Sequence, residues 1–177
     1  MRLGIDAVGV TELMGVAEHA RATATAAAAL LLEGLDGAGC PLVAIPTDTS
    51  EASRAVVEEI AAWTRTALAR QDVPIFWRIL SANPHYLEAT WRKEARLMGA
   101  GALDPRDKRR VALGVAMSVR GRYMIEYHAA VLRRAGDTDQ DILEVLGVVD
   151  HYTTLNTLSE AMQIESDIRP ESTERET

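Results

Sequence analysis

The sequence predicts an all-α fold, and three observations support this. Alanine is abundant whereas the 177 residues include only one Phe, and such a composition favours closely packed helices over strands. Apolar residues recur at helical spacing along most of the chain. No stretch alternates apolar and polar residues as a half-buried strand does. We therefore expect a helical protein that is long enough to bury a hydrophobic core.

Two long helices are expected in the first part of the chain. The first covers residues 11–32, where Thr11 caps its start and a glycine-rich run from Gly34 ends it. An apolar connector follows, and the capping sequence TDTSE over residues 47–51 then begins a helix of about 50–70. Apolar residues at helical spacing give this second helix one inner face.

Two shorter helices follow, and both begin with a proline. Proline is tolerated in the first turn of a helix, because the N–H that it lacks would have no helical partner there. Pro74 therefore begins a helix over 74–81, and Asn83 and Pro84 begin another that runs to about Met98. Glycines directly after Met98 end this second helix.

The longest helix is expected between a cap at Asp104 and a glycine at Gly136. Its first half is apolar or small on almost every side, which is typical of a buried helix. Its second half has one apolar face, and His128 lies on that face rather than on the wet side. His128 is therefore either a core histidine satisfied by hydrogen bonds or a group that lines a pocket between helices.

A last helix is expected over residues 142–162, after a cap at residues 137–139. The polar end of the chain has no residues that could form a core, so it is expected to be disordered. These patterns divide the chain into an N-terminal helical extension over 1–45, a helical domain over 46–164 and a flexible tail over 165–177.

Charge and cysteine content argue against several classes of protein. A net charge of -7 and a pI near 5.1 argue against nucleic-acid binding, because a binding protein must replace the counterions of a phosphate backbone. The apolar segment 22–32 is too short to cross a bilayer, and acidic residues precede it where a signal peptide would be basic. We therefore expect a cytoplasmic protein with no membrane partner. Cys40 is the only cysteine, so no Cys-x-x-Cys redox pair can form within the chain.

Four segments carry a resemblance to a known family. They are VPIFWRILSANPHYLEATW, the Gly-Ala-Leu before Asp104, VALGVAMSVRGRYMIEYHAAVLRRAG and DILEVLGVVDHYTTLNTLSEAM. In this order they resemble the AhpD-like, or carboxymuconolactone decarboxylase-like, family. The resemblance implies an AhpD-like helical bundle, and it implies self-association as a trimer or hexamer.

One departure from the family bears on the chemistry. The family's peroxidase members carry Cys-x-x-Cys-x-x-x-His on the central helix, with a glutamate further upstream. His128 occupies the histidine position, whereas Gly121 and Met124 occupy the two cysteine positions. Arg109, or Arg110 if the register shifts by one, occupies the glutamate position. Because this peroxide reduction needs a thiolate and a resolving thiol, we expect no thiol peroxidase activity.

Two functions of different classes remain. The first is a small-molecule enzyme without a cofactor or metal, which carries out lyase, decarboxylase or isomerase chemistry on a small organic acid. His128 and Tyr123 would be its catalytic residues. The residues expected to bind the substrate are Arg109, Arg110, Arg120, Arg122, Met124, His151 and Tyr152. This function predicts a closed, partly polar cavity at the end of the buried helix.

The second function is a catalytically silent helical scaffold that keeps the fold and has lost the chemistry. On this interpretation the arginines form a solvated surface or pair with nearby acids. His151 and Tyr152 would then line a subunit interface instead of closing a pocket over His128. The scaffold predicts that His128 is fully packed and bonded to the backbone or to a tyrosine, with no cavity beside it.

Overall fold

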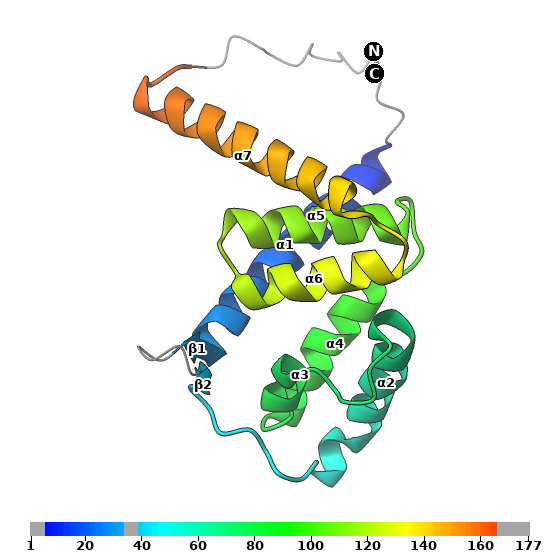
Figure 1. The fold of residues 1–177 in the computed structure, drawn as a ribbon. Helices are drawn as coiled ribbons and strands as arrows, with labels where there is room; N and C mark the ends of the chain where they lie inside the picture. The colour runs from blue at the N-terminus through cyan, green and yellow to red at the C-terminus, as the bar shows by residue number, and fades with distance from the viewer. Residues whose placement is uncertain (1–5, 34–38, 166–177) are drawn as a thin grey trace, which may run out of the picture.

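A computed structural model describes residues 6–33 and 39–165 of the chain. Helices dominate this part of the protein, so the all-α prediction is confirmed (Figure 1). In chain order the elements are α1 (Ala7–Leu30), β1 (Leu31–Glu33), β2 (Gly39–Pro41), α2 (Glu51–Leu68), α3 (Ile75–Leu80), α4 (Pro84–Met98), α5 (Pro105–Ser118), α6 (Arg122–Arg134) and α7 (Asp139–Ala161).

The two strands are an addition that the sequence did not predict. They pair antiparallel at the end of α1, with Leu31 opposite Pro41 and Glu33 opposite Gly39. Each strand has three residues, which is too short for an alternating pattern to be recognised.

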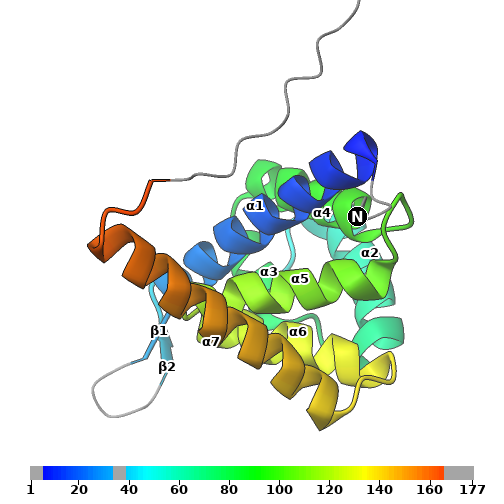
Figure 2. The same ribbon diagram turned by 90° about the horizontal axis from the view of Figure 1, so that it is seen from above.

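Helix α5 is the centre of the bundle. Its most extensive contacts are with α1, α6 and α7, and seen from above it lies between α1 and the pair formed by α6 and α7 (Figure 2). Helices α2, α3 and α4 form the rest of the bundle, where α2 packs against α4 (Figure 1). No helix within the described ranges has the length and apolar character needed to cross a bilayer.

Two regions of the core differ in the size of their side chains. Between α2, α3, α4 and α6 the core is aromatic, and each large apolar side chain buried there contributes roughly 1.5–3 kcal/mol. Its large residues are Phe76, Trp77, Leu87, Trp91, Met124 and Tyr127. Between α1, α4 and α5 smaller residues predominate, which lets α1 lie close to α5: Val16, Ala20, Met98 and Ala112.

The single long helix predicted over 104–136 is wrong, because the chain turns between α5 and α6. The turn is a Schellman motif, in which the Gly121 N–H donates to the Ala116 carbonyl at 2.8 Å and the Arg120 N–H donates to the Met117 carbonyl at 3.0 Å. Arg120 has the left-handed backbone conformation, with φ 57, that such a turn requires. Glycine usually occupies that position, so the arginine concealed the turn from sequence analysis.

The first helix also begins earlier than predicted. Asp6 caps α1 by accepting a hydrogen bond from the Gly9 N–H at 2.8 Å, so the predicted cap at Thr11 is wrong. The Thr11 hydroxyl instead donates to backbone carbonyls within the helix. The apolar spacing of this segment also predicts Met14 on the inner face of the helix, but Met14 is exposed.

The other predicted caps are confirmed. Ser50 accepts a hydrogen bond from Ser53 N–H at the start of α2, and Asn83 does the same with Tyr86 N–H at the start of α4. Thr138 forms a capping box at the start of α7. The tail predicted over 165–177 lies, apart from its first residue, outside the described residues. The division of the chain at residue 45 stays a prediction.

Candidate functional site

Four buried ionisable side chains form one connected cluster, and each comes from a different helix. Burying charged groups is costly unless they pair with one another, so such a cluster needs an explanation. Each of the four side chains belongs to a residue at most 6% exposed. We call this group the Glu94 cluster: His19 from α1, Glu94 from α4, Arg109 from α5 and His128 from α6.

Glu94 is the centre of the cluster. Its Oε1 accepts a hydrogen bond from Arg109 Nη1 at 2.9 Å, and its Oε2 accepts one from His19 Nε2 at 2.9 Å. Burial alone would raise the pKa of the Glu94 carboxyl. The charge of Arg109 and the hydrogen bond from His19 outweigh burial and lower this pKa to about 2. Glu94 is therefore ionised at neutral pH.

His128 is held by Arg109 on one side only. Arg109 Nη1 lies 3.2 Å from His128 Nδ1, and because a guanidinium only donates, Nδ1 must be the acceptor and the proton must be on Nε2. Burial, followed by the positive charge of Arg109, lowers the pKa of His128 to about 3. The buried Nε2–H has no hydrogen-bond partner among the residues that the structure describes. We call this group the free N–H of His128.

Aromatic side chains enclose the cluster on the side of α2. The Tyr127 ring contacts His128 edge-on, with ring centroids 5.3 Å apart. Trp63 stacks on Tyr127 at 5.8 Å, and the Arg109 guanidinium lies 5.7 Å from the centre of the Trp63 ring. Burial, and then the negative charge of Glu94, raises the pKa of Tyr127, so its hydroxyl stays protonated.

Hollows lie on two sides of the Glu94 cluster. An inner hollow of about 180 Å³ is lined by Trp91, Glu94 and Arg109 together with Trp63 and Met98. An outer hollow of about 370 Å³ shares Trp63, Met98 and Arg109 with it and extends along α5 and α6. A third hollow, of about 210 Å³, is lined by His19 between α1, α3 and α4. His128 lines none of these three hollows.

Of the predicted site residues, the structure brings His128 and Arg109 together. Met124 lies one turn before His128 and is buried in the aromatic core. Tyr123 is not beside His128, because Tyr127 stands between them and stacks on Tyr123 at 6.4 Å. The Tyr123 hydroxyl accepts a long hydrogen bond, 3.4 Å, from the backbone N–H of Phe76.

The other three predicted arginines lie outside the cluster. Arg110 Nε donates to the buried carboxylate of Asp137 at 2.9 Å. Arg120 forms the turn between α5 and α6. Arg122 is exposed, 3.5 Å from Glu126 on the same helix. Of the four arginines predicted to bind a substrate, Arg109 is the one that lies in the Glu94 cluster.

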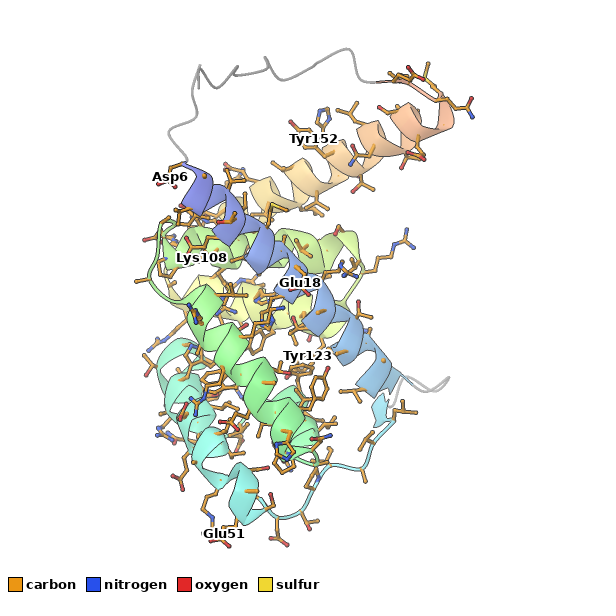
Figure 3. The ribbon with its side chains drawn as sticks, turned by 180° about the vertical axis from the view of Figure 1, so that it is seen from behind. Asp6, Glu18, Glu51, Lys108, Tyr123 and Tyr152 are labelled. Carbon is orange, nitrogen blue, oxygen red and sulfur yellow. The ribbon has the colours of Figure 1, made fainter. Side chains whose placement is uncertain are left out.

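The predicted residues of α7 are also far from the cluster. Tyr152 is 59% exposed and contacts His151 on the same helix. Figure 3 shows Tyr152 on α7 and Tyr123 on α6 in different parts of the molecule. The structure therefore does not place His151 or Tyr152 over His128.

Sequence analysis missed Glu94 and His19, although a signal for Glu94 was present. Leu87, Trp91, Glu94 and Met98 follow one another at helical spacing, so an acid lies on the apolar face of α4. This is the same signal that identified His128. The pairing itself could not be predicted, since α1, α4 and α5 meet only in the folded chain.

Comparisons with known proteins agree with the helical architecture. Residues 84–164 match the model of the carboxymuconolactone decarboxylase family. The chain is similar to the alkylhydroperoxidase AhpD core from Rhodospirillum rubrum ATCC 11170, whose crystal structure superposes with a TM-score of 0.63. The two sequences are 29% identical, and the match covers 73% of this chain and 96% of that chain. A search of curated proteins found no match.

Fold and site together define an all-α bundle with a buried charged cluster between its helices. The predicted resemblance is confirmed: over residues 84–164 and in its fold, the chain resembles the AhpD-like, carboxymuconolactone decarboxylase-like family, and it lacks the Cys-x-x-Cys pair. The structure also explains how an arginine can be buried at the family's glutamate position. Arg109 has its carboxylate partner on the neighbouring helix, at Glu94.

Proposed function

We propose that this protein is a non-redox enzyme with lyase, decarboxylase or isomerase chemistry on a small organic acid. The observation that carries the proposal is the free N–H of His128 beside the charge of Arg109. A buried polar group without a partner costs about 1–3 kcal/mol, and such groups are rare in folded proteins. A substrate oxygen that accepts this hydrogen bond would remove the cost.

The roles of the residues follow from their protonation states. A neutral His128 and a cationic Arg109 both donate hydrogen bonds, so together they stabilise negative charge that develops on a carbonyl or carboxylate oxygen. With pKa values of about 3 and 2, His128 and Glu94 are far from the range in which proton transfer at neutral pH is efficient. Their contribution is therefore electrostatic. In this proposal Glu94 fixes the position of Arg109. Tyr123, which the sequence suggested as a catalytic residue, is given no role.

The inner and outer hollows supply the substrate route. Together they fall within the roughly 300–1,000 Å³ of typical small-molecule sites. They meet at Trp63, Met98 and Arg109, so an acid anchored by Arg109 lies next to the Trp63 ring. A substrate reaches the free N–H of His128 when the Trp63 and Met98 side chains move aside.

Thiol peroxidase activity is not part of this proposal. Gly121 and Met124 stand at the cysteine positions of α6, and the only cysteine is in β2. We expect no hydroperoxide reduction by the purified protein with a dithiol reductant. Activity that disappears in Cys40→Ser would contradict this expectation.

The test follows the free N–H of His128 by ¹H–¹⁵N NMR while a panel of small mono- and dicarboxylic acids is added. At least one acid should shift the Nε2 resonance of the wild type and leave the other histidines unchanged. Arg109→Lys should weaken this response by a factor of ten or more, because a bidentate anchor is lost. Arg110→Lys is the matched control and should respond as the wild type does. A wild type that responds to no acid in the panel would contradict the enzyme proposal.

A second candidate is the catalytically silent scaffold. It is supported by the position of His128, which is 3% exposed and lines none of the three hollows. A scaffold has no use for a free donor, so His128→Leu should then leave the protein equally or more stable. In the enzyme, the same substitution removes the donor, so the variant should no longer bind the acid that shifts the wild-type resonance, whatever its effect on stability.

We also propose that the protein self-associates, as the family resemblance implies. The support comes from α7, which carries several large apolar residues that are exposed in the single chain. Trimers and hexamers are the assemblies expected from the sequence.

A further inference from the structure

Helix α7 is covered less than any other long helix. Its N-terminal half lies over α5, whereas its C-terminal half projects beyond the bundle (Figures 1 and 2). None of its residues, all within the described part of the chain, is buried. Its large apolar residues that are exposed are Leu143, Leu146, Val148, Tyr152, Leu155 and Leu158. An exposed apolar surface of this kind marks a site of association.

The contact between α7 and α5 uses only one side of α7. A Cβ placed at Gly114 would lie 3.3 Å from Val149 and 3.6 Å from Val145, so the glycine lets these two side chains approach α5. A groove of about 360 Å³ runs beside this contact, and Val148 lines it. Val148 is also the first of the exposed apolar residues that continue along the projecting half, followed by Tyr152, Leu155 and Leu158. The groove and the projecting surface are therefore continuous.

The projecting half of α7 has the spacing of a coiled-coil seam. We define the α7 seam as the five exposed residues at alternating intervals of three and four: Val148, His151, Leu155, Leu158 and Met162. The positions beside the seam are uncharged: Tyr152, Thr154, Ser159 and Ala161. The acids Asp150 and Glu160 lie on other faces of the helix. Two seams can therefore meet without bringing like charges together.

We propose that the α7 seam pairs with the α7 seam of a second copy of this chain, in antiparallel orientation. Glu144 lies one turn before Val148 in line with the seam, so a parallel pair would place the two Glu144 side chains opposite each other. An antiparallel pair places Glu144 opposite Met162. Because each bundle packs on the N-terminal half of its own α7, antiparallel pairing also sets the two bundles at opposite ends.

This inference rests on the self-association proposed above but not on the proposed reaction. A contact between identical helices in opposite directions is a two-fold contact, and it builds assemblies with an even number of chains. Of the two assemblies expected from the sequence, it therefore selects the hexamer and excludes the trimer. The smallest stable unit is the dimer.

Light scattering coupled to size-exclusion chromatography tests the surface. The wild type should have twice the 19.3 kDa chain mass or a higher even multiple of it. Leu155→Glu combined with Leu158→Glu should lower the mass at least two-fold with unchanged helix content, because both side chains are exposed in the single chain. The matched control, Thr153→Glu with Thr157→Glu, adds the same charge away from the seam and should keep the wild-type mass.

Three results would overturn the proposal. They are a wild type of single-chain mass, a trimer, and a seam variant that keeps the wild-type mass. Mass reports on the seam and the His128 resonance reports on the proposed function, so either can fail while the other stands.

Disulfide trapping tests the orientation in a Cys40→Ser background. Antiparallel pairing places His151 opposite Leu155 of the other chain, so a mixture of His151→Cys and Leu155→Cys should cross-link as unlike pairs on mild oxidation. Efficient self-cross-linking of each variant alone, without unlike pairs, would show a parallel contact and overturn the proposal.

Discussion

Two ionic clusters start from adjacent residues of α5, Lys108 and Arg109, and they differ in how completely their hydrogen bonds are made within the chain. In the first, Lys108 Nζ donates to Glu12 Oε1 at 2.5 Å and to the Gly99 carbonyl at 2.6 Å. The Leu103 N–H donates to the other Glu12 oxygen at 2.9 Å. The second is the Glu94 cluster, which leaves the free N–H of His128. We call the first the Lys108 cluster.

The difference shows how buried charge can serve structure or offer a site. The Lys108 cluster joins α1 to the loop between α4 and α5, and its hydrogen bonds are made within the chain. A Cβ at Gly101 would collide with the Glu12 carboxylate at 1.9 Å, so the loop closes directly over the pair. The hydrogen bond from Lys108 lowers the pKa of Glu12. Nothing in this cluster needs a ligand, whereas the Glu94 cluster has one donor to offer.

The largest effect is expected from breaking the Lys108 cluster. Lys108→Met leaves the Glu12 carboxylate without its cation and the Gly99 carbonyl without its donor. The free energy of unfolding, measured with urea, should fall clearly while the folded variant still responds to acids. Lys93→Met is the control, because the Lys93–Glu18 pair is exposed and contributes less than about 1 kcal/mol. A similar, small loss in both variants would remove the distinction between them.

Breaking the Glu94 cluster should cost slightly less stability but should also abolish binding. Glu94→Gln leaves Arg109 as a buried cation without a counter-charge, and we expect a loss of about 3 kcal/mol in the free energy of unfolding. The His128 resonance should then no longer respond to acids. Glu59→Gln, which removes a half-exposed partner of Arg92, is the control and should leave the response intact. An unchanged response in Glu94→Gln would show that Glu94 does not position Arg109.

The two titrating groups of the Glu94 cluster predict a stability that falls in acid. The pKa of His128 is depressed from 6.5 to about 3, so its contribution is present above pH 6.5 and is lost as pH falls towards 3. The pKa of Glu94 is depressed from 4.5 to about 2, so its contribution is lost between pH 4.5 and 2.

Urea unfolding at pH 6.5 and pH 4.5 separates the two groups. Within this interval the His128 contribution should fall by about 2–3 kcal/mol, because the unfolded chain binds the proton and the folded chain does not. His128→Gln should remove that part of the slope. Identical slopes in the wild type and His128→Gln would mean that His128 is protonated in the folded protein.

The smallest effect is expected where α1 packs against the turn between α5 and α6. A Cβ at Gly121 would lie 2.7 Å from the Cβ of Ala24 on α1. Gly121→Ala should therefore cost about 1–3 kcal/mol in thermal unfolding by overpacking. Ala24→Gly in the same chain should restore part of the loss. No loss in the single variant would mean that α1 is free to move away from the turn.

Sequence reasoning predicted the helices that local chemistry defines. Ser50 and Asn83 are capping residues with an unambiguous local signal, and α2 and α4 begin where they predict. It failed between α5 and α6, where Arg120 adopts the left-handed backbone conformation that glycine usually adopts. This turn is stabilised by backbone hydrogen bonds and by the packing of α1, so the residues within it give little indication of it.

The site divides in the same way. His128 and Arg109 were predicted, the first from its apolar face and the second from the family alignment of positions. Their partners Glu94 and His19 come from helices distant in the sequence, and only the fold brings them together. The tyrosine that contacts His128 is Tyr127, one turn after Tyr123.

The contact between Gly121 and Ala24 also restricts the order in which this chain could change its chemistry. Gly121 stands at the position of the first cysteine in the peroxidase members, and a side chain there would press against Ala24 of α1. Cysteines introduced at Gly121 and Met124 would therefore strain the bundle before they could act as a dithiol. An engineer who wants peroxide chemistry on this scaffold has to rebuild α1 first, and the thiols can only come second.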